Sequence, residues 1–169
     1  MAGIVVLVSG NGSNLQAIAE ACFKNQINSN IINVISNNPD AFGIVRAKRL
    51  NIPHICIDHK EFSTRDDFDL SLMRHIEQFD PDLIILAGFM RILTKTFTRC
   101  FNGKLINIHP SILPKYPGLY THEKVLLSDD KHHGVTIHYV NEVVDAGAII
   151  AQGILTVSYT HLRAHETIA

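Results

Sequence analysis

The stretch LINIHPSILPKYPGLYTH, residues 105–122, places an amide and an imidazole at the end of a short apolar run. Residues two apart in a strand point to the same side, so Asn107 and His109 are expected to share one face. An amide can hydrogen-bond a developing negative charge, and an imidazole can give or take a proton. The pair therefore suits an acyl-type reaction through a tetrahedral oxyanion. The alternative is a structural histidine beside a capping asparagine.

Asp145, in VVDAGAII, is the acid that could complete such a site. A carboxylate near His109 would favour the protonated imidazole and hold its orientation. An Asp followed by Ala-Gly is also an ordinary turn, which is the alternative for this residue. Pro110, Pro114 and Pro117 restrict the backbone after His109, so the loop is expected to be stiff where a ligand would be met. His138 could face the same site, but the sequence assigns it no role.

The turn SGNGSN, residues 9–14, is a second candidate site, because it precedes an expected helix. Small residues let the backbone approach a ligand, and the N–H groups of a helix start attract an anion. Leu15 stands where a dinucleotide fingerprint needs glycine, and Ser36-Asn37-Asn38 stands where it needs an acid. No G-x-x-x-x-G-K-[ST] motif is present either. A single phosphate monoester at Gly12, Ser13 and Asn14 fits best, and a plain capped turn is the alternative.

Composition excludes several other classes of function. The formal net charge is -1 and charged residues make up 18%, so no basic excess indicates a nucleic-acid partner. Three cysteines lie far apart without a CxxC motif, which supports neither zinc nor disulfides and fits a reducing cytoplasm. His132-His133 lacks a third ligand, so no metal is expected. No apolar run reaches the roughly 18 residues of a membrane span, so no membrane partner is expected.

The elements that must position these residues alternate between strands and helices. Strands are expected at 3–8, 31–35, 54–57, 83–86 and 104–109. Helices are expected at 41–50, 65–79 and 94–101, and a first helix is expected to carry Leu15, Ile18, Ala19 and Cys22 on one face. Such alternation is typical of βαβ units and a parallel sheet. After a long loop to about Lys131, residues 135–140 and 148–155 are expected to form an antiparallel pair. The sequence therefore predicts one α/β domain with an open, mostly parallel sheet.

Four segments, VVLVSGNGSNLQAI, LAGFMRIL, NIHPSILPKYPGLYTH and VDAGAII, resemble the motifs of phosphoribosylglycinamide formyltransferases in the same order. The resemblance runs from Ile4 to about Val157. It implies a Rossmann-like formyltransferase fold and a folate-dependent enzyme of purine biosynthesis. The implied reaction transfers the formyl group of 10-formyltetrahydrofolate, a cosubstrate, to the amine of glycinamide ribonucleotide without a metal. The resemblance further implies a cytoplasmic enzyme of small-molecule substrates, either a monomer or a weak homodimer.

The resemblance also implies roles for single residues. Asn107 would hydrogen-bond the formyl oxygen, His109 would donate a proton and stabilise the oxyanion, and Asp145 would support His109. Gly12, Ser13 and Asn14 correspond to the loop that binds the phosphate of the ribonucleotide. The residues expected to contact folate are Arg65, Met90, Arg91, Ile92, Leu93, Asn107, Asn141, Glu142, Val143, Val144 and Asp145.

Two alternatives to this function remain open at the level of sequence. A formyltetrahydrofolate deformylase shares Asn107, His109 and Asp145 but uses water as acceptor, and AGFMRIL and KYPGL-x-TH favour the ribonucleotide enzyme. The other alternative is an inactive fragment that binds folate or phosphate. Residues 158–169, SYTHLRAHETIA, resemble nothing in the family. We therefore expect them to be an unrelated tail after a formyltransferase domain of residues 1–157 that is incomplete at its C-terminus.

Overall fold

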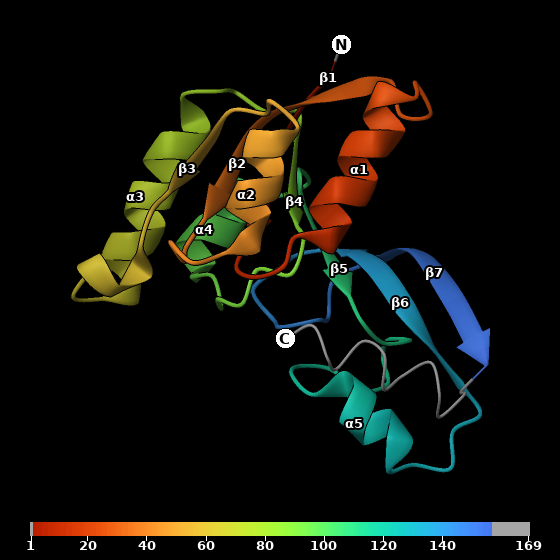
Figure 1. The fold of residues 1–169 in the computed structure, drawn as a ribbon. Coiled ribbons are helices and arrows are strands. Elements are labelled where there is room, and N and C mark those ends of the chain that lie inside the picture. The colour runs from red at the N-terminus through yellow and green to blue at the C-terminus, as the bar shows by residue number, and fades with distance from the viewer. Residues whose placement is uncertain (1, 157–169) are drawn as a thin grey trace.

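A seven-stranded sheet runs through residues 2–156, the part of the chain that the computed structural model describes (Figure 1). Its strand order is β3-β2-β1-β4-β5-β6-β7. The strands are β1 (Ala2–Val8), β2 (Ser29–Ser36), β3 (His54–Cys56), β4 (Leu83–Leu86), β5 (Leu105–His109), β6 (His132–Tyr139) and β7 (Ile149–Thr156). The predicted tail, residues 158–169, lies outside the described residues.

Helices cover both faces of the parallel half of the sheet (Figure 1). They are α1 (Ser13–Phe23), α2 (Phe42–Arg49), α3 (Arg65–Glu77) and α4 (Lys95–Cys100), with a short 3₁₀ turn, η1 (His59–Glu61). A further helix, α5 (Thr121–Leu126), lies apart from these four (Figure 1). Alternate residues of β1 serve opposite faces, as the pleat requires. Val6 packs in one buried cluster with Leu15 of α1, and Leu7 packs in the other with Phe68 of α3. This double burial explains why the strand is apolar at every position.

The sheet changes direction at β5. Strands β1 to β5 pair in parallel, whereas β6 is antiparallel to β5 and β7 is antiparallel to β6. The predicted α/β class, the mostly parallel sheet and the antiparallel strand pair are thereby confirmed. The antiparallel step places Asn107 directly opposite His138 and His109 opposite Thr136. The carboxyl end of β5 consequently lies against the middle of β6.

Two details of the chain differ from expectation. The long loop before Lys131 contains α5, a six-residue helix that is too short to display a helical period. It forms because Thr121 and Val125 are buried, and it starts after Tyr120, whose φ is 59°. Strand β6 begins at His132, earlier than the predicted 135, because pairing with β7 extends through this polar end. None of the described helices is both long and apolar enough to span a membrane.

Candidate active site

Three side chains from two separate segments meet at the end of β5. Asn107 and His109 come from β5 itself, and Asp145 comes from the turn between β6 and β7. The Oδ2 atom of Asp145 lies 3.4 Å from Nδ1 of His109. The Oδ1 atom of Asp145 lies 3.5 Å from Nδ2 of Asn107. We call these three residues the trio, and the structure brings them together as the sequence predicts.

Asp145 is almost buried, with only 8% of its side chain exposed. Its φ of 55° lies in the left-handed region, where Asp is tolerated better than most residues. Burial works to raise the pKa of Asp145, but the contact with His138, the hydrogen bond from the Gly118 N–H and the charge of His109 together lower it below its ordinary value. The carboxylate is therefore held in its charged form beside the imidazole.

The loop after β5, residues 110–120, closes over His109. The Nε2 atom of His109 lies 2.9 Å from the carbonyl oxygen of Tyr116, which fixes Nε2 as a donor. The Gly118 N–H donates to Oδ2 of Asp145 at 2.8 Å. The Ser111 hydroxyl donates to the Lys115 carbonyl at 2.7 Å and keeps the loop folded on itself. The loop thus leaves Nδ1 of His109 as the ring nitrogen that faces Asp145.

The second candidate site, which we call the glycine loop (residues 9–14), joins β1 to α1. Gly12 has a φ of 75°, and a Cβ there would lie 2.6 Å from the Cα of Gly43. Arg46 of α2 donates to the carbonyl and side-chain oxygens of Asn11, both at 2.8 Å. Gly43 donates to the Gly10 carbonyl at 2.9 Å. Helix α2 therefore fixes the loop from behind and leaves the first N–H groups of α1 turned outward.

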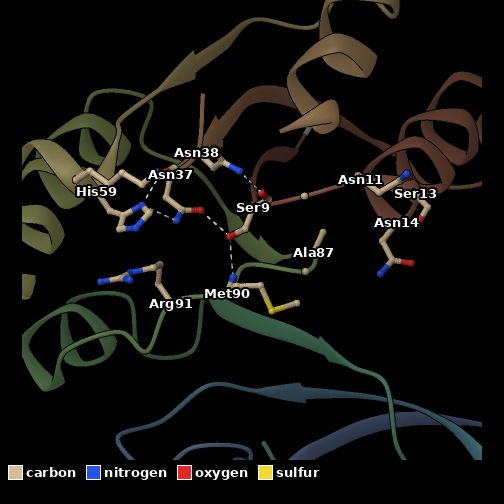
Figure 2. Close-up of a pocket in the computed structure, with 14 residues that line it drawn as sticks. Ser9, Asn11, Ser13, Asn14, Asn37, Asn38, His59, Ala87, Met90 and Arg91 are labelled. Atoms are coloured by element: carbon tan, nitrogen blue, oxygen red, sulfur yellow. Dashed lines mark hydrogen bonds between the residues drawn. The ribbon is translucent and has the colours of Figure 1, made fainter. Parts of the chain in front are cut away.

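A cavity of about 510 Å³ opens in front of the glycine loop (Figure 2). Its lining comprises Ser9, Gly10, Asn11, Gly12, Ser13, Asn14, Asn37, Asn38, His59, Lys60, Ala87, Gly88, Met90 and Arg91. These residues follow the carboxyl ends of β1, β2, β3 and β4, the edge at which open parallel sheets bind ligands. The predicted phosphate residues Gly12, Ser13 and Asn14 all contribute to this lining.

One hydroxyl links the glycine loop to the opposite wall of the cavity. Figure 2 shows Ser9 between Asn37 and Met90. Its Oγ donates to Oδ1 of Asn37 at 2.5 Å and accepts the Met90 N–H at 2.7 Å. The Nδ2 atom of Asn37 is in turn 3.1 Å from Nδ1 of His59. This network could not be predicted from the sequence, because its four residues follow the ends of four different strands.

The predicted folate residues fall into separate groups. Met90 and Arg91 line the cavity, and Nε of Arg91 is buried with no hydrogen-bond partner among residues 2–156. Ile92 is exposed, whereas Leu93 packs against the core. Arg65 lies exposed at the start of α3, outside the cavity lining.

The turn after β6 carries the remaining predicted folate residues. Asn141 accepts the Val143 N–H at 2.9 Å, which shapes the turn. Glu142 pairs with Arg99 of α4. Val143 and Val144 are 62% and 52% exposed, which is unusual for apolar side chains beside a buried aspartate.

A buried carboxylate supports the segment of residues 90–93. Asp69 of α3 is 1% exposed, and its Oδ2 accepts the Thr94 N–H at 2.6 Å. Burial raises the pKa of Asp69 above its ordinary value, against the opposing effect of the bond from Thr94. Thr94 then caps α4 by accepting the Phe97 N–H. Helix α3 therefore holds both Arg65 and the segment of residues 90–93.

Comparison with known proteins places the chain in a family. The formyl transferase family matches residues 2–166. The chain belongs to the formyl transferase family. A phosphoribosylglycinamide formyltransferase of Escherichia coli K12 is 47% identical over 149 residues, which cover 88% of this chain and 70% of that protein. The enzyme of the same name from Haemophilus influenzae is 48% identical over 152 residues, which cover 90% of this chain and 72% of that protein.

Solved structures of formyl transferases have the same architecture. A phosphoribosylglycinamide formyltransferase from Coxiella burnetii superposes with a TM-score of 0.90 at 46% identity, covering 97% of this chain and 79% of that one. A glycinamide ribonucleotide transformylase from Symbiobacterium toebii gives a TM-score of 0.93 at 36% identity, covering 98% and 80%. The resemblance inferred from four motifs is therefore confirmed at the level of family and fold.

The trio gathers an amide, an imidazole and a carboxylate around one point, the side chain of Asp145. His138 also belongs to this cluster, with Nε2 3.6 Å from Oδ1 of Asp145. Its strand register opposite Asn107 is the signal that could have found it, but the register requires knowing that β6 pairs with β5.

Proposed function

We propose that this chain transfers the formyl group of 10-formyltetrahydrofolate to the amine of glycinamide ribonucleotide in purine biosynthesis. The observation that carries the proposal is the meeting of Asn107, His109 and Asp145 at one strand end, with Asp145 3.4 Å from the His109 ring. The relatives named above support the choice of substrates. We further propose a cytoplasmic enzyme that works as a monomer or weak homodimer on small molecules.

The chemistry follows from the atoms that face the reaction centre. The amine nitrogen of the ribonucleotide attacks the formyl carbon, a C–N bond forms, and the carbonyl pair moves to oxygen. In this step Nε2–H of the protonated His109 exchanges the Tyr116 carbonyl for the oxyanion, which an N–H of Asn107 also stabilises. The bond from carbon to the folate nitrogen then breaks, the carbonyl re-forms, and the ammonium proton passes to the departing nitrogen through His109. Asp145 stabilises the imidazolium in both steps.

The glycine loop is the proposed phosphate site of the ribonucleotide. Gly12, Ser13 and Asn14 place backbone N–H groups at the start of α1, where the helix dipole favours an anion. The loop is already fixed by Arg46 and Gly43, so little ordering is required on binding. One monoester phosphate matches the α-helix start, that of α1, in the lining of this cavity.

The folate is proposed to lie along Met90 to Leu93 and the turn from Asn141 to Asp145. Exposed Ile92, Val143 and Val144 offer apolar surface for a planar ring. Arg65 and Arg91 supply positive charge for the carboxylates of a folate tail. The unpartnered Nε of Arg91 supports this assignment, because a buried guanidinium nitrogen normally has an acceptor.

The test is formyl transfer by the 169-residue chain. A 10-formylfolate donor is incubated with the chain, with and without glycinamide ribonucleotide, and loss of the formyl group is followed optically. Loss that requires the ribonucleotide is the expected result. Loss without the ribonucleotide would assign a deformylase instead. Absence of loss in both reactions, with a folded chain, would contradict the proposal and leave a protein that only binds folate or phosphate.

A further inference from the structure

His138 lies directly opposite Asn107 across the β5–β6 ladder. Its side chain is almost wholly buried, with 1% of the residue exposed. Buried histidines need a partner for each ring nitrogen, and both partners of this ring are identifiable. They are a backbone carbonyl on one side and the trio on the other. The ring of His138 is therefore held in a fixed orientation beside Asn107 and Asp145, two members of the trio.

The tautomer of His138 follows from its first partner. The Nδ1 atom lies 2.9 Å from the carbonyl oxygen of Tyr139. A carbonyl can only accept, so Nδ1 must carry a hydrogen. In the neutral ring, Nε2 then carries the lone pair and can only accept. Nδ2 of Asn107, 3.2 Å from that lone pair, is the donor.

The orientation of the Asn107 amide follows from the same contacts. Its nitrogen faces two acceptors, Nε2 of His138 at 3.2 Å and Oδ1 of Asp145 at 3.5 Å. A flipped amide would turn its oxygen toward both acceptors and lose both hydrogen bonds. The bond to His138 uses one N–H. The other makes only the long contact with Asp145 and is available to a ligand.

We infer that His138 is a positioning residue that fixes the amide of Asn107 for the reaction, and that only its neutral imidazole does so. The inference rests on the proposed function, in which an N–H of Asn107 stabilises the formyl oxygen. A second proton on His138 would put an N–H against the N–H of Asn107. The cation would instead pair with Oδ1 of Asp145, 3.6 Å away, and release the amide.

The charged and titratable groups around His138 come from two elements. His109 of β5 faces it edge-on, with ring centroids 6.4 Å apart, and Asp145 faces it from the turn after β6. Strand β7 contributes the apolar Ile149 as its paired residue. Burial works to lower the pKa of His138, but hydrogen bonds with Asp145 and Tyr139 outweigh it and raise the pKa above its ordinary value. The cation therefore persists to higher pH than in a free histidine, and we expect the amide to be released on the acid side.

Two substitutions separate the acceptor of His138 from its charge. His138→Phe keeps a ring but removes the acceptor, whereas His138→Gln keeps an acceptor that cannot titrate. We expect His138→Phe to lower kcat by about 10- to 100-fold, less than the roughly 10²–10³-fold cost of losing an oxyanion donor altogether. Both KM values should stay within about threefold. His138→Gln should keep most of kcat and lose the part of the acid-side decline that His138 causes.

The matched control is His75→Phe on α3. His75 is a partly buried histidine beside Asn33, remote from the trio, and its loss should leave kcat unchanged. An unchanged kcat in His138→Phe, or an acid limb in His138→Gln identical to that of the unsubstituted chain, would overturn the inference. If His138→Phe does not fold, as judged by its thermal melt, the glutamine variant still decides.

A double-mutant cycle tests whether His138 acts through Asn107. In an Asn107→Ala background, His138→Phe should have little further effect on the residual kcat, because the amide that it positions is gone. Full additivity of the two losses would show that His138 acts by another route and would contradict the inference.

A measurement that does not depend on catalysis distinguishes this inference from the proposed function. ¹⁵N NMR of the ring nitrogens should show neutral His138 protonated at Nδ1, and its protonation at lower pH should shift the side-chain amide signals of Asn107. A ring protonated at Nε2, or amide signals that ignore the titration, would overturn the inference even if formyl transfer is observed. If transfer fails but these shifts appear, the structural coupling stands and the proposed function alone is wrong.

Discussion

The glycine loop and the trio present ligand-facing groups by different means. The glycine loop uses backbone, held by a close approach of Gly12 to Gly43 and by Arg46 beneath it. The trio uses side chains that are mostly buried and come from segments 36 residues apart, from His109 to Asp145. Backbone positions depend on local conformation, whereas the trio depends on strand register. A substitution in the first region should therefore alter binding, and one in the second should alter the chemical step.

The largest effect should come from the charge of Asp145. Asp145→Asn keeps the shape but removes the negative charge that stabilises the His109 imidazolium. We expect kcat to fall by at least about 100-fold, a typical contribution of acid–base catalysis, with KM for the ribonucleotide little changed. Steady-state kinetics measures both. Asp80→Asn is the control, because its side chain is 97% exposed. A loss confined to KM would contradict the division between the two regions.

Gly12→Ala should have the converse effect on the glycine loop. The new Cβ would meet the Gly43 backbone at 2.6 Å, and φ of 75° is unfavourable for alanine. We expect KM for the ribonucleotide to rise about tenfold or more, and the free energy of unfolding to fall by about 1–3 kcal/mol. Gly103→Ala shares the positive φ with open space around it and serves as the control. It should lose stability without a change in KM.

Asp69 offers a test of how the wall of the cavity is supported. Asp69→Ala would leave the buried Thr94 N–H without its acceptor, so we expect a loss of about 1–3 kcal/mol in the free energy of unfolding. Denaturant titration at neutral pH measures it. Leu70, an exposed neighbour on α3, gives a control as Leu70→Ala. Equal stability of the two variants would contradict the role assigned to Asp69.

The same carboxylate predicts a pH dependence. Burial raises the pKa of Asp69, so between its ordinary and its raised value the folded chain holds a proton that the unfolded chain has released. Its contribution to the unfolding free energy therefore falls as pH rises through that window. Asp69→Asn should remove this fall while still accepting the Thr94 N–H. Unfolding curves across mildly acid pH should differ in slope between the two chains, and parallel curves would contradict the prediction.

The smallest effect is expected at the surface near the trio. Arg99 pairs with Glu142, but 70% of the Arg99 side chain is exposed. The hydrogen bond from Arg99 lowers the pKa of Glu142 below its ordinary value. Water and salt screen exposed ion pairs, so Arg99→Gln should change stability very little, and less still at high salt. Thermal melts at two salt concentrations would check it. A larger loss would mean that the turn carrying Asp145 depends on this pair.

Sequence reasoning predicted the whole glycine loop, whose residues are consecutive, and most of the trio, whose residues come from separate segments. The glycine loop is visible as six consecutive residues, and apolar runs gave the parallel strands because burial on both faces leaves few polar positions. Asn107 and His109 were predictable from strand alternation. Asp145 was reached by chemistry and by resemblance, since no spacing rule joins it to His109.

What the sequence did not predict depends on tertiary pairing. His138 received no role because its position opposite Asn107 exists only once β6 runs antiparallel to β5. Ser9, Asn37 and His59 form one network only because β1, β2 and β3 end side by side. Helix α5 was missed because burial of Thr121 and Val125, rather than helix propensity, stabilises its six residues.

Because the trio is divided between β5 and the turn after β6, its residues are synthesised at different times during translation. The residues that line the large cavity all lie between Ser9 and Arg91, so the ribosome synthesises them first. Asp145 follows more than 50 residues later, which at about 5–20 residues per second is a delay of several seconds. In a nascent chain, the residues of the cavity are thus synthesised before the carboxylate that completes the trio.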